Sequence, residues 1–310
     1  MPTCDILLAS YNAAKYGPAL LDSLLSQTYQ EFQLIVRDDG STDNSLDLLR
    51  QYQPKFGGRM RIVQDGHPTG SAQGNFSLLL QESDADFVLF SDIDDVWLPT
   101  KTEHFIDLMQ RHQSGLSPDT PLYAFTDVVP VDASLQPVSE GYWKFKQIDP
   151  EISQHLNRSL ICCPILGCAS GINRALAKLT TPVPAEVTGH DWWALLIASA
   201  LGKVVYSAER TLLYRLHQAN VSTPKRVSLT EYARAENRFE KVRRGMLRRS
   251  EQAQALLDAF GPAMTADKRR IVEGFVGLRR EGFLRRRYNL LRGQYLYPDM
   301  ARNLAVLIAS

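Results

Sequence analysis

The sequence has no apolar run approaching the roughly 20 residues that a membrane-spanning helix needs. It also has no low-complexity segment, internal repeat or heptad run, which excludes a solenoid and a coiled coil. The first five residues, Met1-Pro2-Thr3-Cys4-Asp5, include no basic segment and lead into a short strand-like run rather than a signal-peptide core. We therefore expect a folded protein without a secretory leader.

Cysteine is scarce, with four residues in 310. None of them has the paired spacing of a zinc site, and the adjacent pair is a poor basis for a disulfide framework. This usage fits a reduced, cytoplasmic compartment. The four are Cys4, Cys162, Cys163 and Cys168.

The charge is balanced overall but not along the chain. A net charge of +1 with 44% hydrophobic residues is ordinary for a folded protein. Residues 1–224 carry 16 Lys and Arg against 25 Asp and Glu, a net −9, whereas residues 225–310 carry 19 against 9, a net +10. Strand-like patterns also give way to helical periodicity at this point. We expect a larger domain over 1–224 and a basic helical extension over 225–310.

The N-terminal part alternates strand-like and helix-like segments. Apolar runs lie at 6–9, 32–36, 60–63 and 87–90, with helical stripes between them. The second of these helices is predicted to start at Ser41-Thr42-Asp43. This order predicts an α/β fold with a parallel sheet covered by helices on both faces. Such sheets bind ligands beyond the carboxyl ends of their strands.

Three polar clusters follow these runs. Ser10-Tyr11-Asn12 follows the first, Asp38-Asp39 the second and Asp92-Ile93-Asp94 the fourth. One acidic turn is as typical of a solvated loop as of a site, but unrelated loops would not gather carboxylates at one sheet edge. Oxygen ligands suit Mg²⁺ or Mn²⁺, which commonly hold phosphates. The pattern favours a nucleoside-diphosphate site.

The usual glycine-rich phosphate loops are missing. Neither Gly-x-x-x-x-Gly-Lys-Ser/Thr nor Gly-x-Gly-x-x-Gly follows the first run. A metal ion would therefore have to hold the phosphates. A sugar-phosphate nucleotidyltransferase is an alternative, but it should carry a glycine-rich, basic loop where this chain has residues 10–15. A non-catalytic nucleotide-sugar-binding module is another, and metal-dependent nucleotide binding with turnover would distinguish it.

Four ordered motifs resemble those of the family-2 glycosyltransferases, and in particular the bacterial rhamnosyltransferase-like branch. The motifs are Ser10-Tyr11-Asn12, residues 38–43, Gly70 with Asn75-Phe76, and residues 91–99 with Lys101. The resemblance covers roughly residues 4–224. It implies a GT-A fold, a nucleoside-diphosphate-sugar donor, Mn²⁺ or Mg²⁺ as cofactor, and inversion at the anomeric carbon.

The resemblance also implies roles for individual residues. Either Asp38 or Asp39 would fix the base and ribose. Asp94, helped by Asp92 or a metal-bound water and by His217, would hold the metal, and the imidazole favours Mn²⁺ over Mg²⁺. The alternative role for His217 is a contact with the diphosphate. Ile93 stands where the branch often has Gln, which alters a donor contact. The implied donor-binding residues are Ser10, Tyr11, Asn12, Asp38, Asp39, Asn75, Asp92 and Ile93.

An inverting transfer needs a general base opposite the leaving group. Asp191 heads an apolar helix over 192–201 and resembles the family's acidic base at a helix start. Asp is also a common helix cap, and the two roles are compatible.

The loop 166–174 resembles the family's acceptor-side loop, although the same residues are equally typical of a tight turn. The acceptor-side residues are Gly167, Cys168, His190 and Trp192. Adjacent Trp192 and Trp193 diverge by roughly 100°, so at least one should face the core.

The branch implies deoxythymidine-diphosphate-L-rhamnose as donor, with a UDP-sugar next, and a lipid-linked or polysaccharide glycan as acceptor.

In the extension, Leu284, Tyr288 and Leu291 fall at helical spacing beside Arg285-Arg286-Arg287 and Arg292. This stripe either packs on the catalytic part or lies in an anionic membrane surface at the inner face of the cell membrane. Nothing resembling a nucleic-acid-reading motif accompanies these arginines, so we expect no nucleic-acid partner.

Overall fold

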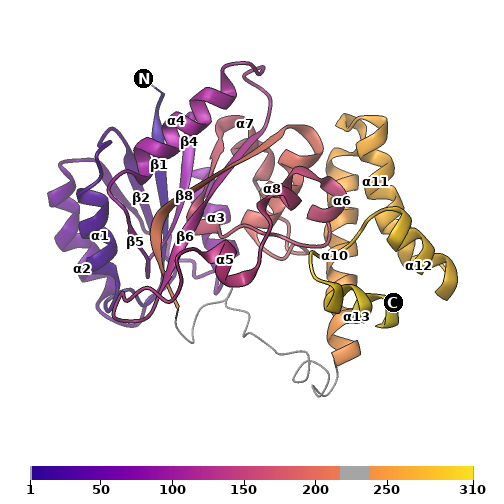
Figure 1. The fold of residues 1–310 in the computed structure, drawn as a ribbon. Helices are drawn as coiled ribbons and strands as arrows, with labels where there is room; N and C mark the ends of the chain where they lie inside the picture. Colours follow the sequence, from indigo (N-terminus) through magenta and orange to yellow (C-terminus); the bar gives the residue numbers. More distant parts are fainter. Residues whose placement is uncertain (1, 217–237, 310) are drawn as a thin grey trace.

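A computed structural model describes residues 2–216 and 238–309. Eight strands form one sheet in the order β3-β2-β1-β4-β7-β6-β8-β5 (Figure 1). The strands are β1 (Cys4–Ser10), β2 (Gln33–Asp38), β3 (Met60–Val63), β4 (Phe87–Asp92), β5 (Val96–Trp97), β6 (Leu122–Val131), β7 (Ser170–Asn173) and β8 (Lys203–Arg215).

The sheet is parallel only in part. Strands β3, β2, β1 and β4 pair in parallel, as the alternation of segments predicted. Strand β7 then enters antiparallel between β4 and β6, and β5 pairs antiparallel with β8. Strands β6 and β8 pair in parallel again. The parallel pairing expected from the alternation over residues 6–90 is therefore present, and β7 and β5 add antiparallel pairs that no sequence pattern indicated.

Helices cover both faces of the sheet, as predicted. Because successive side chains of a strand point to opposite faces, Leu7 belongs to one apolar core and its neighbours Ile6 and Leu8 to the other. One face is covered by α3 (Ala72–Gln81), α7 (Arg174–Thr180) and α8 (His190–Leu201), and the other by α1 (Gly17–Leu25), α2 (Ser45–Tyr52) and α4 (Lys101–Gln113). Shorter helices are α5 (Tyr142–Lys146), α6 (Leu156–Ser159), η1 (Gln53–Phe56), η2 (Pro150–Gln154) and η3 (Gly167–Ala169).

Helix α2 starts later than its sequence signal predicted. It begins at Ser45, and the polar residues before it contact the loop after β1 instead. The Asn12 backbone N–H donates to the Ser41 hydroxyl (2.8 Å), and the Ala14 N–H donates to the Asp43 carboxylate (3.1 Å). Ser41 and Asp43 resemble a helix start in sequence, but their side-chain oxygens accept hydrogen bonds from the loop after β1.

The C-terminal part is helical, as predicted, and packs on α8 (Figure 1). The Thr188 N–H donates to Gln252 Oε1 (2.8 Å), and Arg249 Nε donates to the Ile161 carbonyl (2.7 Å). The predicted boundary near residue 224 lies outside the described residues. The described helices do not include one long and apolar enough to cross a bilayer. The helices are α10 (Arg238–Phe260), η4 (Gly261–Ala263), α11 (Ala266–Gly277), η5 (Leu278–Arg280), α12 (Phe283–Arg292) and α13 (Met300–Ala309).

Candidate functional site

The three polar clusters lie side by side at the carboxyl ends of β1, β2 and β4. In the register of the parallel strands, Ser10 is opposite Asp38 and Ala9 is opposite Asp92. This is the edge at which α/β sheets bind ligands. The convergence predicted from the alternation of segments is therefore present in the fold.

Hydrogen bonds join the loop after β1 to the loop after β2. Asn12 adopts a left-handed backbone conformation (φ 49°), which asparagine tolerates better than most residues. Its side-chain oxygen accepts from the Thr42 N–H (2.9 Å). Asp38 accepts from the Ser10 hydroxyl (3.3 Å) and from the Ser41 N–H (2.9 Å). Tyr11, in contrast, is 58% exposed and leaves an aromatic face open at the sheet edge.

Asp39 turns inward and fixes a third loop. Its two oxygens accept from Arg37 Nη1 (2.7 Å), from the Thr69 N–H and hydroxyl (2.7 and 2.9 Å) and from the Gly70 N–H (2.8 Å). Burial alone would raise the pKa of Asp39, but these donors hold it below the ordinary value. Asn75 is also buried, and its amide bonds to Arg37, so it lies behind Arg37 rather than at the open edge.

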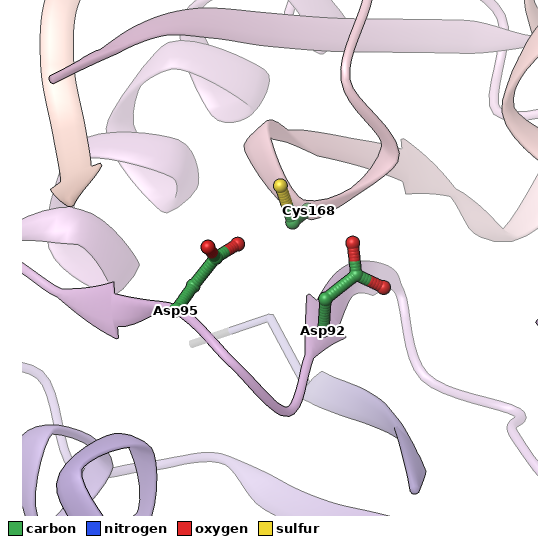
Figure 2. A group of neighbouring side chains, drawn as sticks. All are labelled: Asp92, Asp95 and Cys168. Carbon is green, nitrogen blue, oxygen red and sulfur yellow. The ribbon is translucent and has the colours of Figure 1, made fainter. Parts of the chain in front are cut away.

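The acidic turn after β4 contains the densest group of carboxylates. Ligand atoms of Asp92, Asp95 and Cys168 all lie within 4.8 Å of one another, and Figure 2 shows the three side chains as neighbours between the acidic turn and the Cys168 loop. Asp95 is fully buried, and its Oδ2 has no hydrogen-bond partner among the described residues. Asp94 lies between the two aspartates in the chain but outside this group of three. Ile93 packs against the apolar core on the α1 side.

The environment of these carboxylates fits a divalent cation. Burial, with the charges of Asp94 and Asp191, raises the pKa of Asp92 to about 7. Burial and the charges of Asp94 and Asp92 raise the pKa of Asp95 well above its ordinary value. Closely spaced carboxylates repel one another, and a bound Mg²⁺ or Mn²⁺ would relieve that repulsion through oxygen ligands. Burial also raises the pKa of the Cys168 thiol, so this group stays protonated.

The sequence motif also contains a cation, Lys101, which lies beside the acidic turn. It is fully buried, its Nζ donates to the Cys168 carbonyl, and the same atom lies 3.5 Å from the centroid of the Trp97 ring. Burial lowers its pKa to about 7. Lys101 thus ties α4 to the loop that carries Cys168.

Asp191 lies in the first turn of α8 and is partly exposed. Its Oδ1 accepts from the Trp192 N–H (2.8 Å). Its neighbour His190 is buried against Phe76, with ring centroids 4.1 Å apart, and burial lowers the His190 pKa so that the ring is neutral. A Cβ on Gly167 would lie 3.2 Å from His190 Nε2 and 3.6 Å from Asp191 Cβ. Gly167 therefore allows the predicted acceptor-side loop to approach the start of α8.

The Trp192 ring does not lie between the Gly167 loop and the start of α8. Its indole N–H donates to the Ser159 carbonyl (2.7 Å), and its ring lies 5.5 Å from the Arg249 guanidinium. Trp193 is also buried, next to Phe260. Both tryptophans therefore belong to the core between the catalytic part and α10.

The sequence reasoning missed Asp95 and Arg215. Arg215 is buried at the end of β8, where its N–H donates to Asp95 Oδ1 (3.1 Å) and its Nε donates to the Asp94 carbonyl (2.9 Å). It positions the acidic turn from a strand more than a hundred residues away. Asp95 had a signal, as the third carboxylate of its motif, whereas Arg215 had none before the pairing of β5 with β8 was known. His217, the predicted third metal ligand, lies outside the described residues.

Several known proteins with similar sequences are named as glycosyltransferases. Residues 5–179 match the family described as "Glycosyl transferase family 2". The chain is 26% identical over 227 residues to an uncharacterized glycosyltransferase of Nostoc sp., covering 70% of this chain and 65% of that one. It is 30% identical over 105 residues to a dTDP-rhamnosyl transferase of Shigella flexneri, covering 33% and 36%. The chain thus spans less than two thirds of the length of these curated relatives.

Solved structures show the same fold at low sequence identity. Staphylococcus aureus TarS residues 1–349, in complex with UDP-GlcNAc, has a TM-score of 0.57 and 16% identity, covering 99% of this chain and 89% of that one. A mannosyltransferase of Pyrobaculum calidifontis, in complex with GDP-Man and Mn²⁺, has a TM-score of 0.53 and 14% identity, covering 99% and 87%. The fold is of the GT-A type, and the chain belongs to glycosyl transferase family 2.

Proposed function

We propose that this chain is an inverting, metal-dependent glycosyltransferase that moves a sugar from a nucleoside diphosphate to a hydroxyl group of a lipid-linked or polysaccharide glycan. The observation that carries this proposal is the position of Asp191 beside Gly167, because the next residue, Cys168, belongs to the group with Asp92 and Asp95. The charge of Asp191 also contributes to the raised pKa of Asp92. A donor whose diphosphate is held at the turn would have its anomeric carbon close to Asp191. The leaving group and the base would then face one space.

Asp92, Asp94 and Asp95 are the carboxylates that would hold Mn²⁺ or Mg²⁺, with His217 proposed as a further ligand. When bound, the cation would neutralise negative charge on the departing diphosphate. The orphaned Oδ2 of Asp95 and the raised pKa of Asp92 support this assignment, since both indicate a site short of positive charge. The structure of the related mannosyltransferase contains Mn²⁺, which supports the same cofactor.

The chain's own residues perform the remaining tasks. Asp191 removes the proton from the acceptor hydroxyl as that oxygen attacks the anomeric carbon. The partly exposed Asp38 and the open ring of Tyr11 contact the ribose and base, while the buried Asp39 keeps the Thr69–Gly70 loop in place beside them. Gly167 lies on the acceptor side beside Asp191, whereas the buried thiol of Cys168 lies with Asp92 and Asp95.

The donor is proposed to be dTDP-L-rhamnose, with UDP-sugars as the second choice. The similarity to a dTDP-rhamnosyl transferase of Shigella flexneri supports the first. The UDP-GlcNAc complex of TarS supports the second. The reaction would take place at the cytoplasmic face of the membrane, where a lipid-linked acceptor presents its glycan.

The proposal predicts that Asp94→Asn abolishes most metal-dependent turnover of the donor. The Asn side chain is nearly isosteric but uncharged, so the cation is held more weakly and the rate should fall by about 10²–10³. Hydrolysis of dTDP-, UDP- and GDP-sugars is measured with and without Mn²⁺. Asp84→Asn, at the exposed turn before β4, is the matched control and should keep the wild-type rate. Full activity with unchanged metal dependence in Asp94→Asn would refute the metal assignment.

A further inference from the structure

Exposed apolar side chains are concentrated on α12 and α13. Seven large apolar residues of these two helices are between 51% and 87% exposed, and elsewhere in the described part of the chain only Tyr11, Val138 and Leu247 compare. Monomeric proteins rarely leave such residues clustered unless something covers them. We call the seven the apolar end face, and they are Phe283, Leu284, Tyr288, Leu291, Met300, Leu304 and Ile308.

Helices α12 and α13 are each anchored in the core and are linked to one another by a hydrogen bond. Leu290 of α12 and Val306 of α13 are buried in the same core, so each helix is anchored from within. Arg287 of α12 donates through Nη2 to the Ile308 carbonyl in the last turn of α13 (3.2 Å). Figure 1 places α12 and α13 at the end of the molecule away from α2 and β2. The apolar stripe of α12 therefore does not pack on the catalytic part, which was one of its two expected roles.

The positive charge around the apolar end face indicates what kind of surface binds there. Residues 278–310 contain seven arginines and two acidic residues, a net +5, and α12 itself has four arginines and no acid. The Arg285 side chain is 80% exposed. A second copy that met this face with its own α12 and α13 would bring an equally cationic surface and be repelled. An anionic lipid surface matches both features, because apolar side chains enter the acyl boundary while guanidinium groups reach the phosphates.

We propose that α12 and α13 dock this protein on the surface of an anionic phospholipid bilayer. Docking would keep the catalytic part beside a membrane in which lipid-linked glycans are displayed. It requires neither donor nor catalysis, so it is tested without them. Its failure would leave the proposed glycosyl transfer untouched.

The test is cosedimentation of the full chain with vesicles of phosphatidylglycerol and phosphatidylcholine, and with phosphatidylcholine alone. We expect binding to the anionic vesicles at low salt and release near 1 M salt, where the screening length falls to about 3 Å. Leu284→Ser combined with Leu291→Ser should weaken binding at least about tenfold. Arg285→Gln and Arg292→Gln should each weaken it roughly fivefold.

Matched controls separate docking from general changes of polarity or charge. Val138→Ser removes an exposed apolar side chain after β6, and Arg50→Gln removes an exposed charge from α2. Both should bind vesicles like the wild type. All variants should melt like the wild type, since the altered side chains are exposed. Absence of binding to anionic vesicles, or binding that the α12 variants leave unchanged, would overturn the proposal. Self-association lost in the α12 variants, without vesicle binding, would assign the face to a second copy of the chain.

Discussion

Three aspartates that are close together in the sequence have different environments. Ligand oxygens of Asp92 and Asp95 lie within 4.8 Å of each other and both groups have raised pKa values, while Asp94 lies outside that pair. The backbone of Arg215 satisfies one oxygen of Asp95 and leaves the other without a partner. A carboxylate in that condition is costly unless it is protonated or binds a cation. The acidic turn is therefore suited to a metal that arrives with its phosphate ligand.

The proposed role of Asp191 as the base is tested by a single substitution. Asp191→Asn should reduce sugar transfer by ~10²–10⁴, the usual contribution of a general base, with donor affinity nearly unchanged. The Asn oxygen can still accept from the Trp192 N–H, so the start of α8 should stay intact. Transfer kinetics and calorimetric titration of the donor measure the two effects separately.

Glu186→Gln provides the control, because Glu186 is an exposed carboxylate in the loop before α8. It should change neither quantity. A large loss of donor affinity in Asp191→Asn with little loss of rate would instead place Asp191 on the donor side of the site.

Strand β2 contributes a buried arginine as well as carboxylates. Arg37 is 1% exposed and bonds to Asp39, to Asp65 (2.8 and 3.0 Å) and to the His67 carbonyl. Hydrogen bonds from Arg37, together with that from the His67 N–H, lower the pKa of Asp65 to about 2. This one side chain holds the loop after β3 against the end of β2, where the donor base is proposed to bind.

Arg37→Met should lower the free energy of unfolding by about 3–5 kcal/mol, because it leaves the buried Asp39 carboxylate without its cation. Arg61→Met on neighbouring β3 is the matched control. Arg61 pairs with Glu82 at the surface, with half of its side chain exposed, and its loss should cost no more than about 1 kcal/mol. Urea unfolding of both variants gives the comparison. Equal losses would show that the Arg37 network does not stabilise the loop.

The whole molecule is divided by charge but not by its core. The apolar core on the α8 face continues from Leu7 of β1 through Trp193 to Ala253 of α10 and Phe275 of α11. The acidic N-terminal part and the basic helices are therefore joined by shared burial, in addition to hydrogen bonds between side chains and backbone. The two parts therefore differ in charge but share one apolar core.

A shared core predicts a single unfolding transition. Ala253→Asp places a charge in the interface between α10 and α8, and it should cost more than about 3 kcal/mol. Ala259→Asp, the same change at an exposed position of α10, should stay within about 0.5 kcal/mol. Tryptophan fluorescence and helical circular dichroism should move together in both. Loss of the helices in Ala253→Asp while the tryptophan transition stays in place would indicate two independent domains.

The sequence by itself determined the order of strands and helices over residues 4–92, the edge where Ser10, Asp38 and Asp92 meet, and the family. These follow from local properties, since side-chain periodicity and polar residues at strand ends can be read without knowing which segments touch. The helical, basic character of the extension is local in the same sense.

The tertiary structure decided what depends on contacts between distant residues. The antiparallel entry of β7, the inward turn of Asp39 and the burial of Trp192 each require a neighbour from another element. Arg215 reaches Asp95 across 120 positions, a contact that no periodicity encodes. The exposure of Leu284 is of the same kind, because an amphipathic stripe specifies that a helix has an apolar face but not whether protein or another surface covers it.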